Sequence, residues 1–259
     1  MNLCLIGGGN KEPMAKQALD AAYSPDTPTK VLLVPSACST QKSYDKKVPS
    51  HLALFKAMGV ATEVLHDFGQ SPVDLAQKFG EATVIFTIAG HSPSLMDNLK
   101  RHGTDRHYQE AADQGKMLAG TSAGALVPFR LSHINPTRLR TEELDFTMLP
   151  MLDLIPAAGA AHANVVDEGK TVNRLTDFAN RFSATDLEYG LAMENNAGLL
   201  VVSGIARVTH SDETAGIHVL CKNDQENPVR LIADNTDMQS VFDAIMRQRD
   251  PIAGPVSPS

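Results

Sequence analysis

A serine between two glycines is the feature of this sequence with the clearest chemical potential. Residues Gly120-Thr121-Ser122-Ala123-Gly124 fit the G-x-S-x-G pattern of a nucleophile elbow. In an elbow, a buried strand turns sharply into a helix, and the glycines remove Cβ atoms that would clash. The serine hydroxyl then stands exposed at the positive N-terminal end of that helix. The spacing favours Ser122 as a nucleophile over the alternative, a tight turn that serves only packing.

A serine hydroxyl needs a base before it can attack a carbonyl carbon. The chain has nine histidines, and His162, 40 residues after Ser122, is our candidate because it lies on the expected loop that follows the expected strand 152–156. His133 is a weaker rival for the same role. With a histidine as base, the expected chemistry is acyl transfer through a covalent intermediate.

Two backbone N–H groups are the expected oxyanion hole. The residue after an elbow nucleophile, here Ala123, generally donates one of them. Gly90 is the expected second donor, because it follows the buried strand 82–88 and precedes a helix that begins at Ser92-Pro93. His91, beside Gly90, is expected at the rim of the site, where it would contact substrate.

A carboxylate that orients the histidine would complete a triad. Glu194 is our candidate, since it directly follows the expected strand 187–193. Asp145 and Asp153 are rivals that lie between Ser122 and His162 in the sequence.

The elements that must position these residues alternate between strand and helix over the first 125 residues. This alternation predicts an α/β fold with a mostly parallel, doubly wound sheet that has helices on both faces. Ligand sites in such sheets lie at the carboxyl ends of the strands, where the candidate residues fall. Residues 131–150 are expected to be a loop, and 157–161 another. We expect the C-terminal part to add a small antiparallel β-rich region, residues 1–250 to form one domain, and 251–259 to be a disordered tail.

Composition excludes several classes of function. The net charge is −7 and the chain has no basic patch, so we expect no nucleic-acid partner. It has no apolar run long enough for a membrane span, and three scattered cysteines without metal spacing. The loop Gly7-Gly8-Gly9 lacks the full nucleotide-binding pattern. The sequence therefore predicts a cytoplasmic protein, monomer or homodimer, without metal or cofactor.

The chain resembles the dipeptidase E and cyanophycinase family of serine peptidases, whose fold is related to class I glutamine amidotransferases. The resemblance spans roughly residues 1–210. The matching segments are 7–9, 34–37, 88–90, the elbow 120–125, 154–156 with His162, Arg174-Leu175 and 190–196. It implies a serine peptidase with Ser122, His162 and Glu194 as its catalytic residues.

The sequence departs from the family where substrate is recognised. The arginines that the resemblance leads us to expect soon after His162 are largely missing, and Arg174 is the remaining candidate for substrate binding. Its alternative is a helix-surface pair with Asp177. We therefore expect a small peptide or amide substrate, with only a weak preference for an N-terminal aspartate.

Two other functions are compatible with the sequence. An α/β-hydrolase-type esterase would place its histidine late in the chain, at His210 or His218. A catalytically decayed, amidotransferase-like binding domain would keep the fold without the chemistry.

Overall fold

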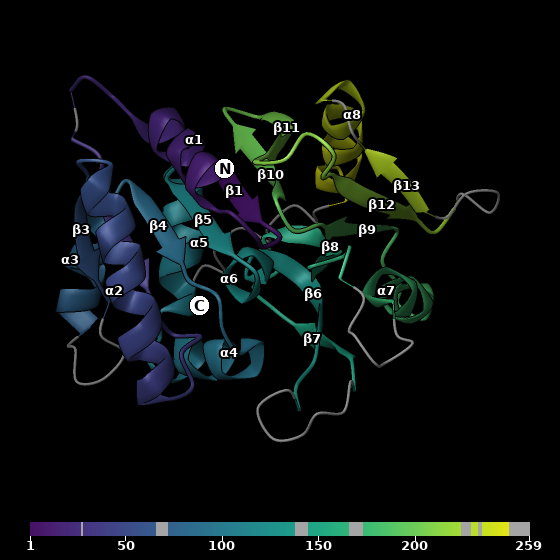
Figure 1. Ribbon diagram of the computed structural model, residues 1–259, viewed down its shortest axis with the longest axis horizontal. Helices are drawn as coiled ribbons and strands as arrows, with labels where there is room; N and C mark the ends of the chain where they lie inside the picture. The colour runs from purple at the N-terminus through teal and green to yellow at the C-terminus, as the bar shows by residue number, and fades with distance from the viewer. Residues whose placement is uncertain are drawn as a thin grey trace, which may run out of the picture.

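The computed structural model describes residues 1–26, 28–65, 72–137, 145–165, 173–223, 229–232 and 235–248. These residues form two sheets, one of seven strands and one of six, with helices packed against them (Figure 1). The predicted tail 251–259 lies outside the described residues.

The seven-stranded sheet contains the predicted parallel strands. Its order is β11-β10-β1-β5-β4-β2-β3, and the five strands from β1 to β3 run parallel. The hairpin of β10 and β11 extends the sheet with antiparallel strands, and Ser203 and Gly204 take the positive φ angles of a tight turn between these two strands. The strands are β1 (Asn2–Ile6), β2 (Lys30–Val34), β3 (Ala61–Val64), β4 (Val84–Thr87), β5 (Met117–Thr121), β10 (Ala197–Val202) and β11 (Ile205–His210).

Helices cover both faces of this sheet, which gives the predicted doubly wound arrangement. Alternate residues of β1 point to opposite faces, so Leu3 and Leu5 join one core and Cys4 and Ile6 the other. Helices α1 and α2 pack on the Cys4 side, and α3, α4 and α5 on the Leu3 side. Their bounds are α1 (Glu12–Ala22), α2 (Gln41–Ala57), α3 (Pro72–Glu81), α4 (Ser92–Arg101) and α5 (Asp105–Asp113).

The six-stranded sheet follows the short helix α6 (Ala123–Leu126) and has the order β13-β12-β9-β8-β6-β7. Strands β6, β8 and β9 are parallel, and the outer strands are antiparallel to their neighbours. The elements are β6 (Phe129–Ile134), β7 (Thr147–Pro150), β8 (Ile155–Ala161), α7 (Arg174–Ser183), β9 (Tyr189–Met193), β12 (Ile217–Cys221), β13 (Val229–Ile232) and α8 (Asn235–Met246).

Two segments predicted as loops are strands. Part of 131–150 forms β6 and β7, and the small-residue run 157–161 belongs to β8, which is buried throughout. The small residues are needed because the sheet packs closely there: a Cβ on Gly159 would lie 2.5 Å from the Phe129 ring. Alanine and glycine thus indicate tight packing at this place rather than a turn.

Neither a membrane-spanning helix nor a metal-binding cluster is found in the part of the chain described above. Its helices are too short or too polar to cross a bilayer. Its His, Cys, Asp and Glu side chains form no group of three that could hold a metal ion.

Candidate active site

Ser122 sits at a sharp turn between β5 and α6. Its backbone has φ 51° and ψ −117°, a conformation that L-residues rarely adopt. The Ser122 N–H donates to the carbonyl of Ile6 at 2.9 Å, which ties the turn to the end of β1. Strained backbone of this kind is typical of functional sites, and it matches the predicted nucleophile elbow.

The two elbow glycines are required by close packing. A Cβ on Gly120 would lie 2.6 Å from the backbone of Gly124. A Cβ on Gly124 would overlap the backbone carbonyl of Thr87 in the neighbouring strand β4. Side chains at these positions would push the elbow away from the sheet and displace Ser122.

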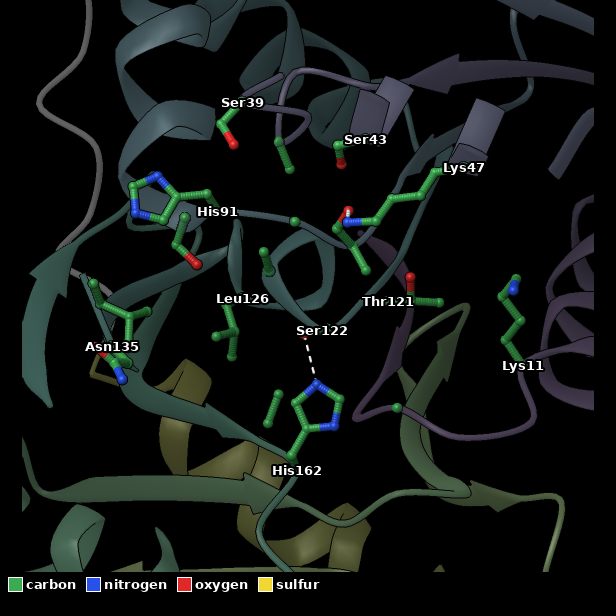
Figure 2. Close-up of a pocket in the computed structure, with 18 of the residues that line it drawn as sticks. Lys11, Ser39, Ser43, Lys47, His91, Thr121, Ser122, Leu126, Asn135 and His162 are labelled. Carbon is green, nitrogen blue, oxygen red and sulfur yellow. Dashed lines mark hydrogen bonds between the residues drawn. The ribbon is translucent and has the colours of Figure 1, made fainter. Parts of the chain in front are cut away.

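His162 contacts Ser122 directly. It follows β8 with φ 60°, and its Nε2 lies 2.8 Å from Ser122 Oγ (Figure 2). Burial of β8 and a hydrogen bond from Ala163 N–H to Met193 O fix the backbone on both sides of the histidine. Ser122 and His162, 40 residues apart, are therefore brought together as predicted.

Asn195 holds the other side of the His162 ring. Its Oδ1 lies 2.6 Å from His162 Nδ1, so Nδ1–H donates and Nε2 is left to accept from the serine hydroxyl. The Asn195 backbone N–H donates to Asn164 Oδ1 at 2.9 Å. Gly8 lies beneath this pair, since a Cβ there would overlap both the His162 ring and Asn195 Oδ1.

Glu194 lies elsewhere, contrary to the expectation that its carboxylate orients His162. Its Oε1 is 2.8 Å from His218 Nε2, and its Oε2 accepts from the Gly216 N–H at 2.9 Å. Residues 194 and 195 follow the end of β9 and project in different directions, so the neighbouring Asn195 takes the place predicted for Glu194.

The other predicted rivals also lie apart from Ser122. Asp153 pairs with Arg130 at 2.7 Å, and Asp145 is exposed. His210 is exposed at the end of β11, and His218 contacts Glu194. With His162 in the base position, the order of residues expected for an α/β-hydrolase is not found.

The predicted oxyanion donors line the cavity that also contains Ser122. Ala123 begins α6, and the first hydrogen bonds to Ser122 O in that helix come from Ala125 and Leu126. Gly90 follows β4, and among the described residues neither the Gly90 N–H nor the Ala123 N–H has a hydrogen-bond partner. Both residues line the same cavity as Ser122 and His162, so both N–H groups are available to a developing negative charge.

That cavity has a volume of about 670 Å³ and is rich in basic groups. Its described lining includes Lys11, Lys46, Lys47 and Arg174, and no aspartate or glutamate. A protein with a net charge of −7 therefore has a positive pocket beside Ser122. Figure 2 shows Lys11 and Lys47 on one side of Ser122, and His91 and Asn135 on the other.

Both substrate-binding candidates line this cavity. Arg174 lies over the ring of Phe146, with its Cζ 5.6 Å from the centroid. The alternative partner, Asp177, is engaged by His133 and by Arg181, each at 2.7 Å. His91 is the N-cap of α4: its Nδ1 accepts from the Ser94 N–H, and its Nε2 donates to the carbonyl of Pro136.

His133 is buried in the wall of the site rather than serving Ser122. It stacks on Phe146 with ring centroids 4.5 Å apart, and its Nε2 lies on Asp177. Burial lowers the pKa of His133, although the hydrogen bond to Asp177 acts to raise it. Phe146 is thus held between His133 and Arg174, and Asp177 supports the stack from behind.

The sequence alone did not identify Asn195, Gly8, Lys47 or Phe146 as parts of the site. In the sequence, Gly8 is recognisable only as part of a glycine loop, and Asn195 only as part of the segment 190–196. Lys47 lies in the first half of α2, before the internal Pro49. The helical periodicity of the sequence is clear only for 51–58, after this proline.

Comparisons with known proteins identify a family for this chain and show similar folds. The model of peptidase family S51 matches residues 3–209. A crystal structure of a candidate peptidase E protein from Listeria monocytogenes EGD-e superposes with a TM-score of 0.61 at 17% identity, covering 82% of this chain and 98% of that one. A peptidase from an acI-B1 Actinobacterium superposes with a TM-score of 0.69 at 17% identity, covering 89% and 93%. No curated protein matches the sequence significantly.

Proposed function

Because the chain belongs to peptidase family S51, the dipeptidase E family of serine peptidases, we propose that it hydrolyses small peptides with Ser122 as nucleophile and His162 as base. One observation carries this assignment: the hydroxyl of the strained Ser122 is 2.8 Å from His162 Nε2. A serine with a histidine in hydrogen-bond reach is the arrangement that nucleophilic catalysis requires.

In the first half of the reaction, Ser122 Oγ attacks the carbonyl carbon of the scissile amide while its proton passes to His162 Nε2. The carbonyl oxygen becomes negative and accepts hydrogen bonds from the Gly90 and Ala123 N–H groups. The C–N bond then breaks as the imidazolium returns its proton to the leaving amine, leaving an acyl ester on Ser122.

In the second half, His162 takes a proton from a water molecule, whose oxygen attacks the ester carbonyl. Collapse of the second tetrahedral intermediate breaks the bond to Ser122 Oγ, which recovers a proton from His162, and the free acid leaves. Throughout, Asn195 accepts from His162 Nδ1–H and keeps Nε2 directed at the serine.

The substrate we propose carries a carboxylate on its acyl side, as an N-terminal aspartyl residue does. Arg174 supports this, because it lines the cavity and is held over Phe146. A guanidinium can stack on an aromatic face and can bind a carboxylate bidentately. A single half-exposed arginine supports only a modest preference.

The experiment compares kcat/KM for Asp-Leu with that for Ala-Leu and Leu-Leu in the wild type and in Arg174→Ala. We expect a preference for Asp-Leu of about tenfold, equivalent to about 1.4 kcal/mol, that Arg174→Ala removes. Arg181→Ala takes one charge from the same helix outside the cavity and serves as the control. An aspartyl preference that survives Arg174→Ala would contradict the role of this residue.

A further inference from the structure

Lys47 makes a contact that has no role in the reaction as described above. Its Nζ donates to the carbonyl oxygen of Ala89 at 2.9 Å. That carbonyl and the N–H of Gly90 belong to the same peptide group. The ammonium of Lys47 is therefore hydrogen-bonded to the C=O of the same peptide group whose N–H is the proposed oxyanion donor.

The geometry of a peptide makes this contact consequential. A trans peptide is planar, and its C=O and N–H point in opposite directions. Anchoring the Ala89 oxygen therefore fixes the direction of the Gly90 N–H. On this basis, and resting on the proposed function, we infer that Lys47 is a positioning residue for the oxyanion hole.

Other contacts already hold Gly90 and His91 in place, so the Ala89–Gly90 peptide is the part of this segment whose orientation needs a further hydrogen bond. The His91 N–H donates to Ala37 O at 2.9 Å. Gly90 packs so tightly on the Ala37 carbonyl that a Cβ would overlap it. These contacts fix the Cα of Gly90, but they do not prevent the Ala89–Gly90 peptide from rotating about its flanking bonds. The Lys47 hydrogen bond opposes that rotation.

Lys47 itself is held in place by the buried face of α2. The Nδ1–H of His51 donates to the backbone carbonyl of Lys47 at 2.7 Å, and His51 and Val48 are buried against the sheet. Figure 2 shows the Lys47 side chain extending from α2 into the pocket above Ser122. The ammonium therefore reaches Ala89 from a rigid element.

The ammonium also contributes charge. A donor bonded to a carbonyl polarises the whole peptide, so its N–H becomes a stronger donor to a negative oxygen. Because the oxyanion exists only in the transition state and the tetrahedral intermediate, this contribution lowers the barrier without tightening substrate binding.

The test compares Lys47→Met, which keeps the alkyl stem and loses the ammonium, with Lys46→Met and Lys47→Arg. Lys46 is the neighbouring residue in α2 and lines the same cavity, so Lys46→Met controls for the loss of one positive charge. For each variant we would measure kcat and KM for Asp-Leu and the inhibition constant of an aspartyl boronic acid, which forms a tetrahedral adduct with the serine.

We expect Lys47→Met to lower kcat ten- to a hundredfold with KM changed less than threefold, somewhat less than the loss of a whole oxyanion donor. The inhibition constant of the boronate should rise by a similar factor, and Lys47→Arg should restore most of the activity. If Lys47→Met unfolds, Lys47→Gln should still show the kcat-specific loss.

Two outcomes would overturn the inference. One is a Lys47→Met enzyme whose kcat matches that of Lys46→Met, and the other is an increase in KM at constant kcat. Either leaves the proposed function intact, because wild-type turnover that Ser122→Ala abolishes establishes that function separately. A wild type without turnover would refute the proposed function, and the inference would fall with it.

Discussion

Asn195 Oδ1 lies 2.6 Å from Nδ1 of His162, the histidine that contacts Ser122. A neutral carboxamide therefore occupies the position where a serine hydrolase commonly has a carboxylate. Because the amide oxygen faces the ring, it accepts from Nδ1–H and keeps the tautomer in which Nε2 can act as base. The same arrangement occurs with asparagine in papain-like cysteine proteases.

The first prediction concerns this contact. Asn195→Leu keeps the volume but removes the acceptor, so His162 loses its fixed tautomer and orientation. We expect kcat to fall between about 10²- and 10⁴-fold, the range that a positioned base contributes. Asn195→Asp restores an acceptor and should keep kcat within tenfold of the wild type or above it. Steady-state kinetics with Asp-Leu would measure both.

Glu194→Gln is the matched control for this prediction. The Glu194 carboxylate contacts His218 and Gly216, and glutamine can keep one of these hydrogen bonds. We expect kcat to change less than tenfold and the free energy of unfolding to fall by about 1 kcal/mol. A loss of kcat in Glu194→Gln larger than that in Asn195→Leu would assign the triad to Glu194 after all.

The second prediction concerns Gly8, which has φ 152° and supports the His162–Asn195 pair. In Gly8→Ala the new methyl group would overlap both side chains, so the pair must move away from Ser122. We expect kcat to fall at least 100-fold, measured on protein whose fold is checked by circular dichroism. Gly59→Ala is the control, since Gly59 has φ 72° but open space around its Cα. It should cost about 1 kcal/mol of stability through strain and leave kcat unchanged. Equal activities of the two variants would contradict the proposed role of Gly8.

The third prediction is an acid-sensitive stability caused by His51. This histidine is 4% exposed, and burial lowers its pKa from 6.5 to about 4, with Lys11 and Lys47 adding repulsion. The unfolded chain therefore binds a proton at a higher pH than the folded chain. Stability from this group is complete above pH 6.5, falls as the pH drops toward 4, and is then lost. The total loss is on the order of 3 kcal/mol.

Urea unfolding at pH 7.5 and 4.5 would measure this effect. In His51→Phe the difference in unfolding free energy between the two pH values should shrink by about 2 kcal/mol relative to the wild type. His210→Gln, at an exposed position, should leave that difference as it is. A His51→Phe protein that loses as much stability in acid as the wild type would contradict the assignment.

A structural feature of this protein can be predicted from the sequence when the residues that determine it are close together in the chain. The elbow could be predicted because its two glycines and its serine are close in sequence, and because glycine is required there for a steric reason, the close packing of the backbone. The parallel strands of the first sheet could be predicted because they are apolar and bounded by turn residues. The sequence wrongly predicts a loop for 157–161 of β8, because the alanines and Gly159 reflect packing against Phe129, a contact that the local pattern does not show.

The histidine partner could not be predicted for a related reason. Glu194 and Asn195 are adjacent, and which of them reaches His162 depends on the chain direction after β9 and on the position of His218 in β12, 24 residues later. Local patterns carry no information on this distant contact. The Lys47–Ala89 contact likewise joins residues 42 positions apart.

The most direct test of the central claim is covalent labelling of the purified full-length protein with a fluorophosphonate, followed by peptide mapping in a mass spectrometer. The probe forms an adduct only with an activated serine. We expect one adduct, at Ser122, that is absent in Ser122→Ala and at least 100-fold slower to form in His162→Ala. An adduct at another serine, or none on folded wild-type protein, would contradict the account; the second result would favour a decayed binding domain.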